Sequence, residues 1–254
     1  MSSIPGPFDL FIRKLETHAS LADEDRDAIM ALPHRMSLVE AQSYTVREGD
    51  RPEACSILVS GLACRHKQTR EGLRQIVALN IPGDPLDLQN LLLDVSDHNV
   101  QTLTRAELAV VPRGELRALM AARPGVAHAL RVLMLVESSI FREWILNVGR
   151  RDAPARLAHL LCELGVRLKA QGLSDSDDYE LPMTQEQLAD ALGLTPVHVN
   201  RTIRTLELRG FLERDRRRIR IADWPQMREF GDFNPRYLHL PTAKPEASVA
   251  RAGT

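Results

Sequence analysis

Two closely spaced helix starts separated by a glycine most constrain what this chain can fold into. Thr184 with Gln187 three residues later forms a capping box, in which side chains and backbone amides satisfy one another at a helix start. Gly193 suits the left-handed turn that ends such a helix. Thr195 followed by Pro196 is the N-cap and first-turn pair that begins another. Two short helices joined by a glycine-containing turn form a helix-turn-helix.

The second predicted helix has one apolar face and one polar face. At about 100° per residue, Val199, Ile203 and Leu206 cluster on the side that faces the first helix. The remaining side chains point outward or lie on the flanks: Val197, His198, Asn200, Arg201, Arg204, Thr205 and Leu208. An outward face of Arg, Asn and His suits the major groove of DNA.

Individual side chains on this face match particular groups of a DNA duplex. Arg201 could fork onto guanine, and Asn200 could reach adenine or a phosphate. His198 or Thr195, near the helix start, could hold a phosphate together with the free backbone amides.

The positive charge of the chain is concentrated in the same segment. The whole chain has 33 Lys plus Arg and 34 Asp plus Glu, a formal charge of -1, and so has no overall attraction to nucleic acid or membrane. Residues 195–221 contain eight arginines and three acids, so their local charge is eight minus three, or +5. GFLERDRRRIRI (210–221) also predicts a β-hairpin of two strands about a DRR turn (215–217), whose basic tip would lie as a wing over the DNA backbone.

Together these features predict a DNA-binding surface. Its predicted residues are Thr184, Thr195, Pro196, Val197, His198, Asn200, Arg201, Arg204, Arg216, Arg217 and Arg218. The alternative is a ligand- or redox-sensing protein-interaction module whose winged domain does not bind DNA. An enzyme is not expected, because no two glycines lie closer than seven residues and no HExxH or GxSxG motif occurs. No catalytic residue and no metal ligand is predicted.

The first half of the chain predicts helices followed by a small antiparallel β-structure. Helices are expected within the first 35 residues, over 8–17 and from Ser20 to a stop at Pro33. Short apolar runs at 55–59, 75–79, 99–104 and 107–111 then predict the strands of a barrel or sandwich. Four glycines punctuate this part 12, 11 and 11 residues apart, at Gly49, Gly61, Gly72 and Gly83. Pro112 begins a short helix that ends near Arg123.

One long helix is expected next, because apolar residues recur at helical spacing over 126–148 without glycine or proline. The stripe consists of Val126, Leu130, Leu133, Ile140, Trp144 and Val148, with Glu137 inside it. A helix about 35 Å long exceeds what a small barrel needs to cover itself, so the stripe is predicted to be a dimer seam, with a core-packing face as the alternative. Glu137 would need a partner, Arg131 or Arg142, or exposure at the edge of the seam.

The order of a glycine-punctuated barrel, a long helix and PMTQEQLADALGLTPVHVNRTIRTLELRGFLE (182–213) resembles the Crp/Fnr family of bacterial transcription regulators, up to about Trp224. REGD (47–50) and LVSGLA (58–63) carry the resemblance in the barrel. It implies an α+β fold: an N-terminal antiparallel β-roll of the cyclic-nucleotide-binding type (a double-stranded β-helix), a long dimerisation helix and a C-terminal winged helix-turn-helix. The corresponding domains are 1–124, 125–149 and 150–225, and 226–254 is expected to be a tail.

The resemblance further implies a homodimer on a palindromic DNA site with two half-sites, and RNA polymerase is a further candidate partner. Arg201 stands at the position of the family's guanine-reading arginine. Pro196 and Val197 stand where the best-known members read further bases, so the resemblance does not define the preferred half-site.

No cofactor is predicted for the β-roll. Where cyclic-nucleotide-binding members have a glutamate and an arginine, this chain has Leu88 and then Asp97 or His98. Between Arg74 and Arg105 there is no Lys or Arg. Asp84, Asp87, Asp94 and Asp97 contribute -4 over the same stretch. A cyclic phosphate would therefore be repelled, and cyclic AMP or GMP is not expected as the effector.

Other effectors have little support in the sequence. No cysteine precedes Cys55, which argues against the iron–sulfur cluster of the oxygen-sensing branch. His66 or His98 could ligate haem iron, but a lone histidine is more often a surface or hydrogen-bonded residue. Cys55 and Cys64, on neighbouring predicted strands, could form a redox pair or act as small buried apolar residues.

No apolar run is long enough to cross a bilayer, and the start of the sequence has no signal-peptide stretch. We therefore expect no membrane partner and a cytoplasmic location.

Overall fold

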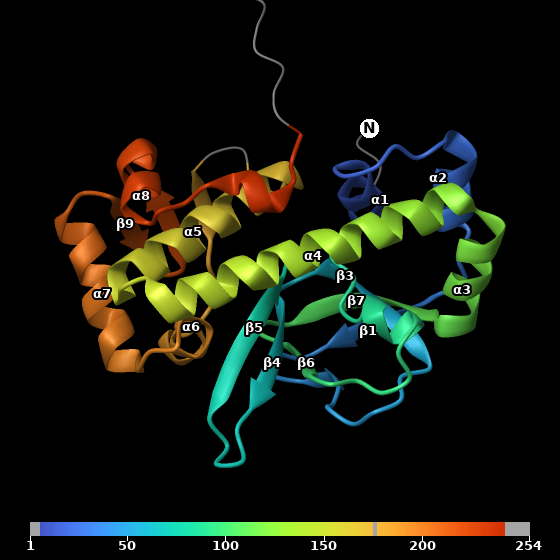
Figure 1. The fold of residues 1–254 in the computed structure, drawn as a ribbon, viewed down its shortest axis with the longest axis horizontal. Helices are drawn as coiled ribbons and strands as arrows, with labels where there is room; N and C mark the ends of the chain where they lie inside the picture. The colour runs from blue at the N-terminus through green and yellow to red at the C-terminus, as the bar shows by residue number, and fades with distance from the viewer. Residues whose placement is uncertain (1–5, 175–176, 242–254) are drawn as a thin grey trace, which may run out of the picture.

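The computed structural model describes residues 6–174 and 177–241 and consists of two folded halves joined by a long helix (Figure 1). One half is a β-roll with accompanying helices, and the other is a winged helical domain. Helix α4 (Pro124–Arg150) runs across both halves. The predicted α+β fold and the predicted order of its parts are confirmed.

The β-roll is built from two antiparallel sheets. Strands β1 (Arg35–Val39), β7 (Ala106–Pro112) and β3 (Ala54–Ser60) form one sheet in that order. Strands β2 (Tyr44–Val46), β6 (Asn99–Thr102), β4 (Ala63–Gln68) and β5 (Arg74–Asn80) form the other. Val46, Leu58, Val100 and Leu108 pack together between the sheets. Gly61 has φ +91°, and a Cβ there would lie 2.6 Å from the Arg105 carbonyl oxygen, so the turn between β3 and β4 requires glycine.

Four short helical elements accompany the roll. They are α1 (Asp9–Glu16), α2 (Asp23–Met30), the 3₁₀ turn η1 (Leu88–Leu91) and α3 (Arg113–Ala122). The second helix starts at Asp23 and not near Ser20 as predicted, because three acids occupy its first turn and Ala22 is the N-cap. Strand β1 was not predicted, since most of it is exposed and its pattern lacks a clear apolar alternation.

The winged domain begins at α5 (Ala153–Ala170), directly after α4. Its helix-turn-helix consists of α6 (Gln185–Leu192) and α7 (Pro196–Leu208), and its sheet has the order β8 (Asp178–Glu180), β10 (Arg218–Ile221), β9 (Leu212–Asp215). Strand β8 lies between α5 and α6 in a polar segment that shows no strand signal in the sequence. Three residues are too few to show an alternation, although Tyr179 is buried and its hydroxyl donates to the Leu161 carbonyl oxygen over 2.7 Å.

The predicted dimer seam on α4 is wrong for most of its members. Val126, Leu130 and Leu133 are each 1% exposed and pack against the N-terminal helices and β3, and Trp144 is buried against the winged domain. Helix α4 has apolar residues on two sides, and the predicted stripe is the side that faces the chain's own core. Of the remaining predicted members, Glu137, Ile140 and Val148 are partly exposed.

The predicted tail boundary at residue 226 is also wrong. It falls inside α8 (Trp224–Phe230), and the chain continues as a 3₁₀ turn, η2 (Pro235–Leu238), that packs against α4 and α5. Met227, Phe233 and Leu238 are buried. Apolar residues do recur here every three or four positions, at Met227, Phe230, Phe233 and Tyr237, and the prediction of a tail overlooked that spacing. The rest of the predicted tail, 242–254, lies outside the described residues.

Buried ion pairs hold the two halves together. Asp84, in the turn after β5, binds Lys14 of α1 at 2.9 Å and Arg167 of α5 at 2.8 Å. Arg167 also donates to the Leu79 carbonyl oxygen at 2.9 Å and to Glu163 at 3.3 Å. Burial alone would raise the pKa of Asp84, but Lys14 and Arg167 lower it overall. The helix-turn-helix is fixed to the roll separately, because Arg74 of β5 pairs with Asp190 of α6 at 2.6 Å.

His66 of β4 is fully buried on the outer face of the roll, beside the Tyr44 ring. Neither of its ring nitrogens has a hydrogen-bond partner. Burial, with the nearby Arg74 and His98, lowers the pKa of His66 to about 4. The histidine is therefore neutral in the folded chain at neutral pH.

The lowered pKa of His66 predicts how the stability of the fold depends on pH. Above the unfolded pKa of 6.5 the ring is neutral in both states. As the pH falls from 6.5 toward about 4, the unfolded chain binds a proton that the folded chain does not, so the free energy of unfolding decreases. Replacing His66→Phe fills the same space without a titrating ring, so its urea midpoint should fall less steeply than that of the unmodified chain over this interval. Parallel midpoint curves for the two proteins would contradict the assignment.

Candidate nucleic-acid interface

The starts and turn of the helix-turn-helix are formed by the residues that the sequence indicated. Thr184 accepts from the Gln187 amide at 3.1 Å, and the Gln187 side chain accepts from the Thr184 amide at 2.9 Å. Gly193 has φ +64° and ends α6. Thr195 accepts from the His198 amide at 3.3 Å at the start of α7. The capping-box, glycine and N-cap predictions are confirmed.

The two faces of α7 also agree with the predicted partition. Val199, Ile203 and Leu206 are at most 5% exposed and contact the core of the domain. The outward residues are all exposed: Pro196, Val197, His198, Asn200, Arg201, Arg204 and Leu208. The helical period did not single out Thr202, which is buried and donates its hydroxyl to the His198 carbonyl oxygen at 2.8 Å.

The basic hairpin forms the predicted wing. Strands β9 and β10 pair antiparallel with Asp215 opposite Arg218, and the turn places Arg216 at φ +52°. Arg216 and Arg217 are exposed at the tip. Arg218, also predicted to bind DNA, is the first residue of β10 and pairs with Asp178 of β8 at 2.6 Å.

Four guanidinium groups are thus available to an anion on this side of the domain. Arg201, Arg204, Arg216 and Arg217 are exposed and make no ion pair within the part of the chain that the structure describes. The neighbouring Arg209 instead lies over the Phe230 ring, 4.6 Å from its centroid. Unpaired guanidinium groups beside the exposed N-terminus of α7 form a surface that matches phosphate in charge and geometry.

A second site is a cavity of about 400 Å³ between the roll and α4. Arg65 and Lys67 of β4 line one wall, and Met134, Glu137 and Phe141 of α4 line another. Arg65 forms a bidentate pair with Glu137 at 3.1 and 3.2 Å and also donates to two backbone carbonyl oxygens. Neither sequence-predicted partner of Glu137, Arg131 or Arg142, is the one that it binds.

The four aspartates before β6 do not all face this cavity, although the sequence suggested that they would. Asp84 and Asp87 are buried elsewhere, and Asp94 pairs with Arg113 at 2.8 Å. Only Asp97 lines the cavity, where it accepts from His98 at 2.7 Å. Leu88 is buried against the N-terminal helices. The cavity therefore contains both signs of charge, and its cations come from β4, outside the stretch in which the sequence was searched.

The cysteines do not form the redox pair considered above. Cys55 packs with the N-terminal helices, whereas Cys64 packs on the outer face of the other sheet against the winged domain. Burial raises the pKa of Cys64 and of Cys162 to about 12, and raises that of Cys55 as well. Among residues 6–174 and 177–241, no group of three or more His, Cys, Asp or Glu is placed to hold a metal ion.

Helix α4 is the one described helix that is long and apolar enough to cross a membrane, by length and composition only. In this structure its buried residues belong to the cores of both halves, as expected for a core helix of a globular fold.

Sequence comparisons agree with both halves of the structure. The cyclic nucleotide-binding domain matches residues 38–123, and the Crp-like helix-turn-helix domain matches residues 155–230. The nitrogen fixation regulation protein FixK of Azorhizobium caulinodans is 30% identical over 173 residues, which cover 68% of this chain and 69% of that protein. The transcriptional activator protein FnrL of Cereibacter sphaeroides is 27% identical over 194 residues, which cover 75% and 77%.

Among solved structures, FixK2 from Bradyrhizobium japonicum has the same fold, with a TM-score of 0.72 and 24% identity. The match covers 78% of this chain and 98% of that one. A cyclic-nucleotide-binding-type roll, a Crp-like helix-turn-helix and relatives that are named regulators lead to one conclusion: the chain belongs to the Crp/Fnr family of DNA-binding transcription regulators.

Proposed function

We propose that this regulator is a cytoplasmic homodimer that reads a palindromic DNA site with one α7 helix in each half-site. The observation that carries the proposal is the uninterrupted outward face of α7, whose polar and cationic side chains are exposed while its apolar face is buried. A helix of this kind fits the major groove, and a wing beside it fits the phosphate backbone.

Each predicted residue has a role in this proposal. Arg201 forks onto guanine, and Asn200 contacts adenine or a phosphate. Arg204, Arg216 and Arg217 bind phosphates, since they are exposed and unpaired within the described residues. Thr184, Thr195 and His198, at the starts of α6 and α7, present backbone amides and side chains to the DNA backbone. Pro196 and Val197 face the bases, and Arg218 orients the wing through Asp178.

The homodimer is proposed to pair along a stripe of α4 that borders the cavity, since Met134, Ser138 and Phe141 line the cavity and are also partly exposed. Arg131, Met134, Ser138, Phe141, Ile145 and Val148 alternate three and four residues apart and are exposed or partly exposed. That spacing is the 3.5-residue repeat of a two-helix coiled coil. Ile145 in this stripe is 70% exposed, and Leu135 on the same helix is 68% exposed, which is unfavourable unless a second copy covers them.

The signal that controls the regulator is proposed to be neither a cyclic nucleotide nor an iron–sulfur cluster. Arg65 is already engaged by Glu137, and Lys67 binds Glu48 and the Asp97 carbonyl oxygen. Cys55 lies in a different core cluster from Cys64 and Cys162, and burial raises the pKa of all three thiols, which disfavours the thiolate that an iron–sulfur cluster needs. Several relatives are named transcriptional activators, so RNA polymerase is the partner that activation would require.

Replacing Arg201→Ala should weaken binding by about 1–3 kcal/mol at one base pair per half-site, because the bidentate contact to guanine is lost there. Replacing Arg217→Ala should weaken binding to every sequence alike and reduce the slope of log K against log salt by about one. Fluorescence anisotropy on single-base variants of a selected site measures both. An equal loss on all sequences for Arg201→Ala would refute its reading role.

Replacing Ile145→Lys should give a chain of monomer mass in sedimentation velocity, because the proposed α4 seam would bury two unpaired charges. Leu38→Lys is the matched control, since Leu38 is 55% exposed on β1 of the roll and is not part of the proposed seam. A dimer for both variants would place the subunit contact elsewhere.

Titration calorimetry with cyclic AMP should give no saturable heat, because the Arg65 guanidinium would have to exchange Glu137 and two carbonyl oxygens for the cyclic phosphate. Saturable binding in the micromolar range would show that the cavity retains the ordinary ligand of its domain family.

A further inference from the structure

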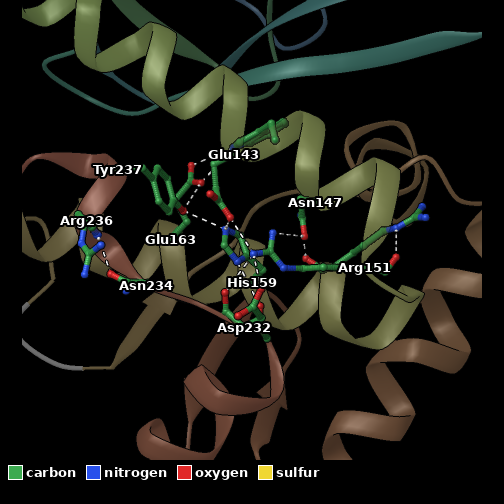
Figure 2. A network of polar contacts seen from close by, with 12 residues as sticks. Glu143, Asn147, Arg151, His159, Glu163, Asp232, Asn234, Arg236 and Tyr237 are labelled. Atoms are coloured by element: carbon green, nitrogen blue, oxygen red, sulfur yellow. Dashed lines mark hydrogen bonds and ion pairs between the residues drawn. The ribbon is translucent and has the colours of Figure 1, made fainter.

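The segment that follows the winged domain lies across the junction of α4 and α5. It comprises residues 231–240, here called the strap, and it begins directly after the part of the chain that matches the Crp-like helix-turn-helix domain. Figure 2 shows its polar contacts to both helices. The function proposed above depends on the orientation of the winged domain relative to α4, and the strap contacts both helices at the junction that determines this orientation.

On α5 the strap surrounds the ring of His159. A Cβ at Gly231 would lie 2.8 Å from the His159 backbone nitrogen, so the close approach requires glycine. The Gly231 carbonyl oxygen lies 3.2 Å from Nδ1 of His159, and the Tyr237 hydroxyl lies 3.0 Å from Nε2. The Tyr237 ring stacks on the imidazole with a centroid distance of 5.8 Å, and Phe233 contacts it edge-on at 5.2 Å.

Tyr237 then extends the contact to a buried charge. Its hydroxyl donates to Glu163 at 2.8 Å, and Glu163 is fully buried on α5. The same carboxylate accepts from the Trp144 indole of α4 at 3.0 Å and from Arg167 at 3.3 Å. The strap therefore contributes one of the few donors that compensate a carboxylate held out of water.

On α4 the strap makes contact at two points. Asp232 binds Arg151 at the C-terminal end of the helix, through its carboxylate at 2.9 Å and its carbonyl oxygen at 3.0 Å. Arg151 also pairs with Glu143 at 2.7 Å. His239 lies 3.2 Å from the Ser139 hydroxyl. Ser139 and Arg151 are twelve positions apart, or about 18 Å along the helix.

These contacts constrain the angle between α4 and α5, which the backbone connection alone leaves free. The covalent connection between α4 and α5 is a single point, at Arg151 and Asp152. A segment that is attached to α4 at two well-separated places and to α5 at His159 and Glu163 fixes the two helices as a rigid pair.

We propose that the strap is a positioning element for DNA recognition: Asp232 and Tyr237 fix the angle between α4 and α5, and so set the spacing between half-sites that the dimer accepts. This inference rests on the proposed function. Recognition helix α7 packs on α5, while the proposed dimer seam is on α4, so the α4–α5 angle determines how far apart the two copies of α7 lie. Inserting one base pair moves a half-site by about 3.4 Å and rotates it by about 35° around the duplex.

The test is a binding series on duplexes that carry the selected half-sites with spacers shortened or lengthened by one and two base pairs. The unmodified chain should prefer one spacer by tenfold or more over its neighbours. A double variant, Asp232→Asn with Tyr237→Phe, should bind the neighbouring spacers within about threefold of the best one. Its preference among half-site sequences should not change, because no DNA-contacting residue is altered, and a merely destabilised protein would lose all sites together.

Two controls separate the strap from general effects. Glu229→Gln also neutralises an exposed carboxylate near the strap, but its side chain makes no ion pair within the described residues, so its spacer preference should match the unmodified chain. A chain that ends at Pro241 keeps every strap contact and should behave in the same way.

A second readout does not require DNA. Backbone amides of 150–157 should exchange hydrogen faster in the double variant than in the Glu229→Gln control, because the junction is released. Unchanged exchange, or an unchanged spacer preference, would overturn the strap's role. Absence of sequence-selective binding by the unmodified chain would instead refute the proposed function, and the positioning role would fall with it.

Discussion

The arrangement of the two halves depends on one buried guanidinium. Arg167 lies 7% exposed between Asp84 of the roll and Glu163 of its own helix, and all three charges are out of contact with bulk water. Ionised groups are costly to bury unless they are paired, so separating the halves would leave Asp84 and Arg167 uncompensated. The winged domain is consequently held in a defined place against the roll, with α6 docked on β5 through Arg74 and Asp190.

With the winged domain in that position, the two sides of α4 have different environments. One side supplies Val126 and Leu133 to the roll's core and Trp144 to that of the winged domain, while the opposite side leaves Leu135 and Ile145 exposed. The first side fixes the tertiary structure, and the second belongs to the surface on which we propose that a copy of the chain pairs. Because the strap ties the end of α4 to α5, any pairing along α4 is transmitted to the orientation of α7.

Interactions between residues close in sequence allowed the helix-turn-helix to be predicted. The capping box at Thr184, the left-handed Gly193 and the N-cap at Thr195 depend on neighbouring residues, and the helical period then assigned the faces of α7. The predictions that were wrong concern contacts between residues distant in sequence. An apolar stripe does not indicate whether the same chain or another chain covers it, so the α4 seam was misassigned. The partner of Glu137 was missed because it is Arg65, 72 positions away. The strap is short and contains Gly231 and Pro235, and its position is fixed by tertiary contacts.

In the proposed complex, two copies of α7 are presented together to one duplex. Hydroxyl-radical footprinting on a site selected from random DNA tests this arrangement most directly, since the cleavage pattern reports which backbone positions are covered. We expect two equally protected patches about one helical turn apart, related by the two-fold symmetry of the site. A single protected patch, or protection without a fixed separation, would contradict it.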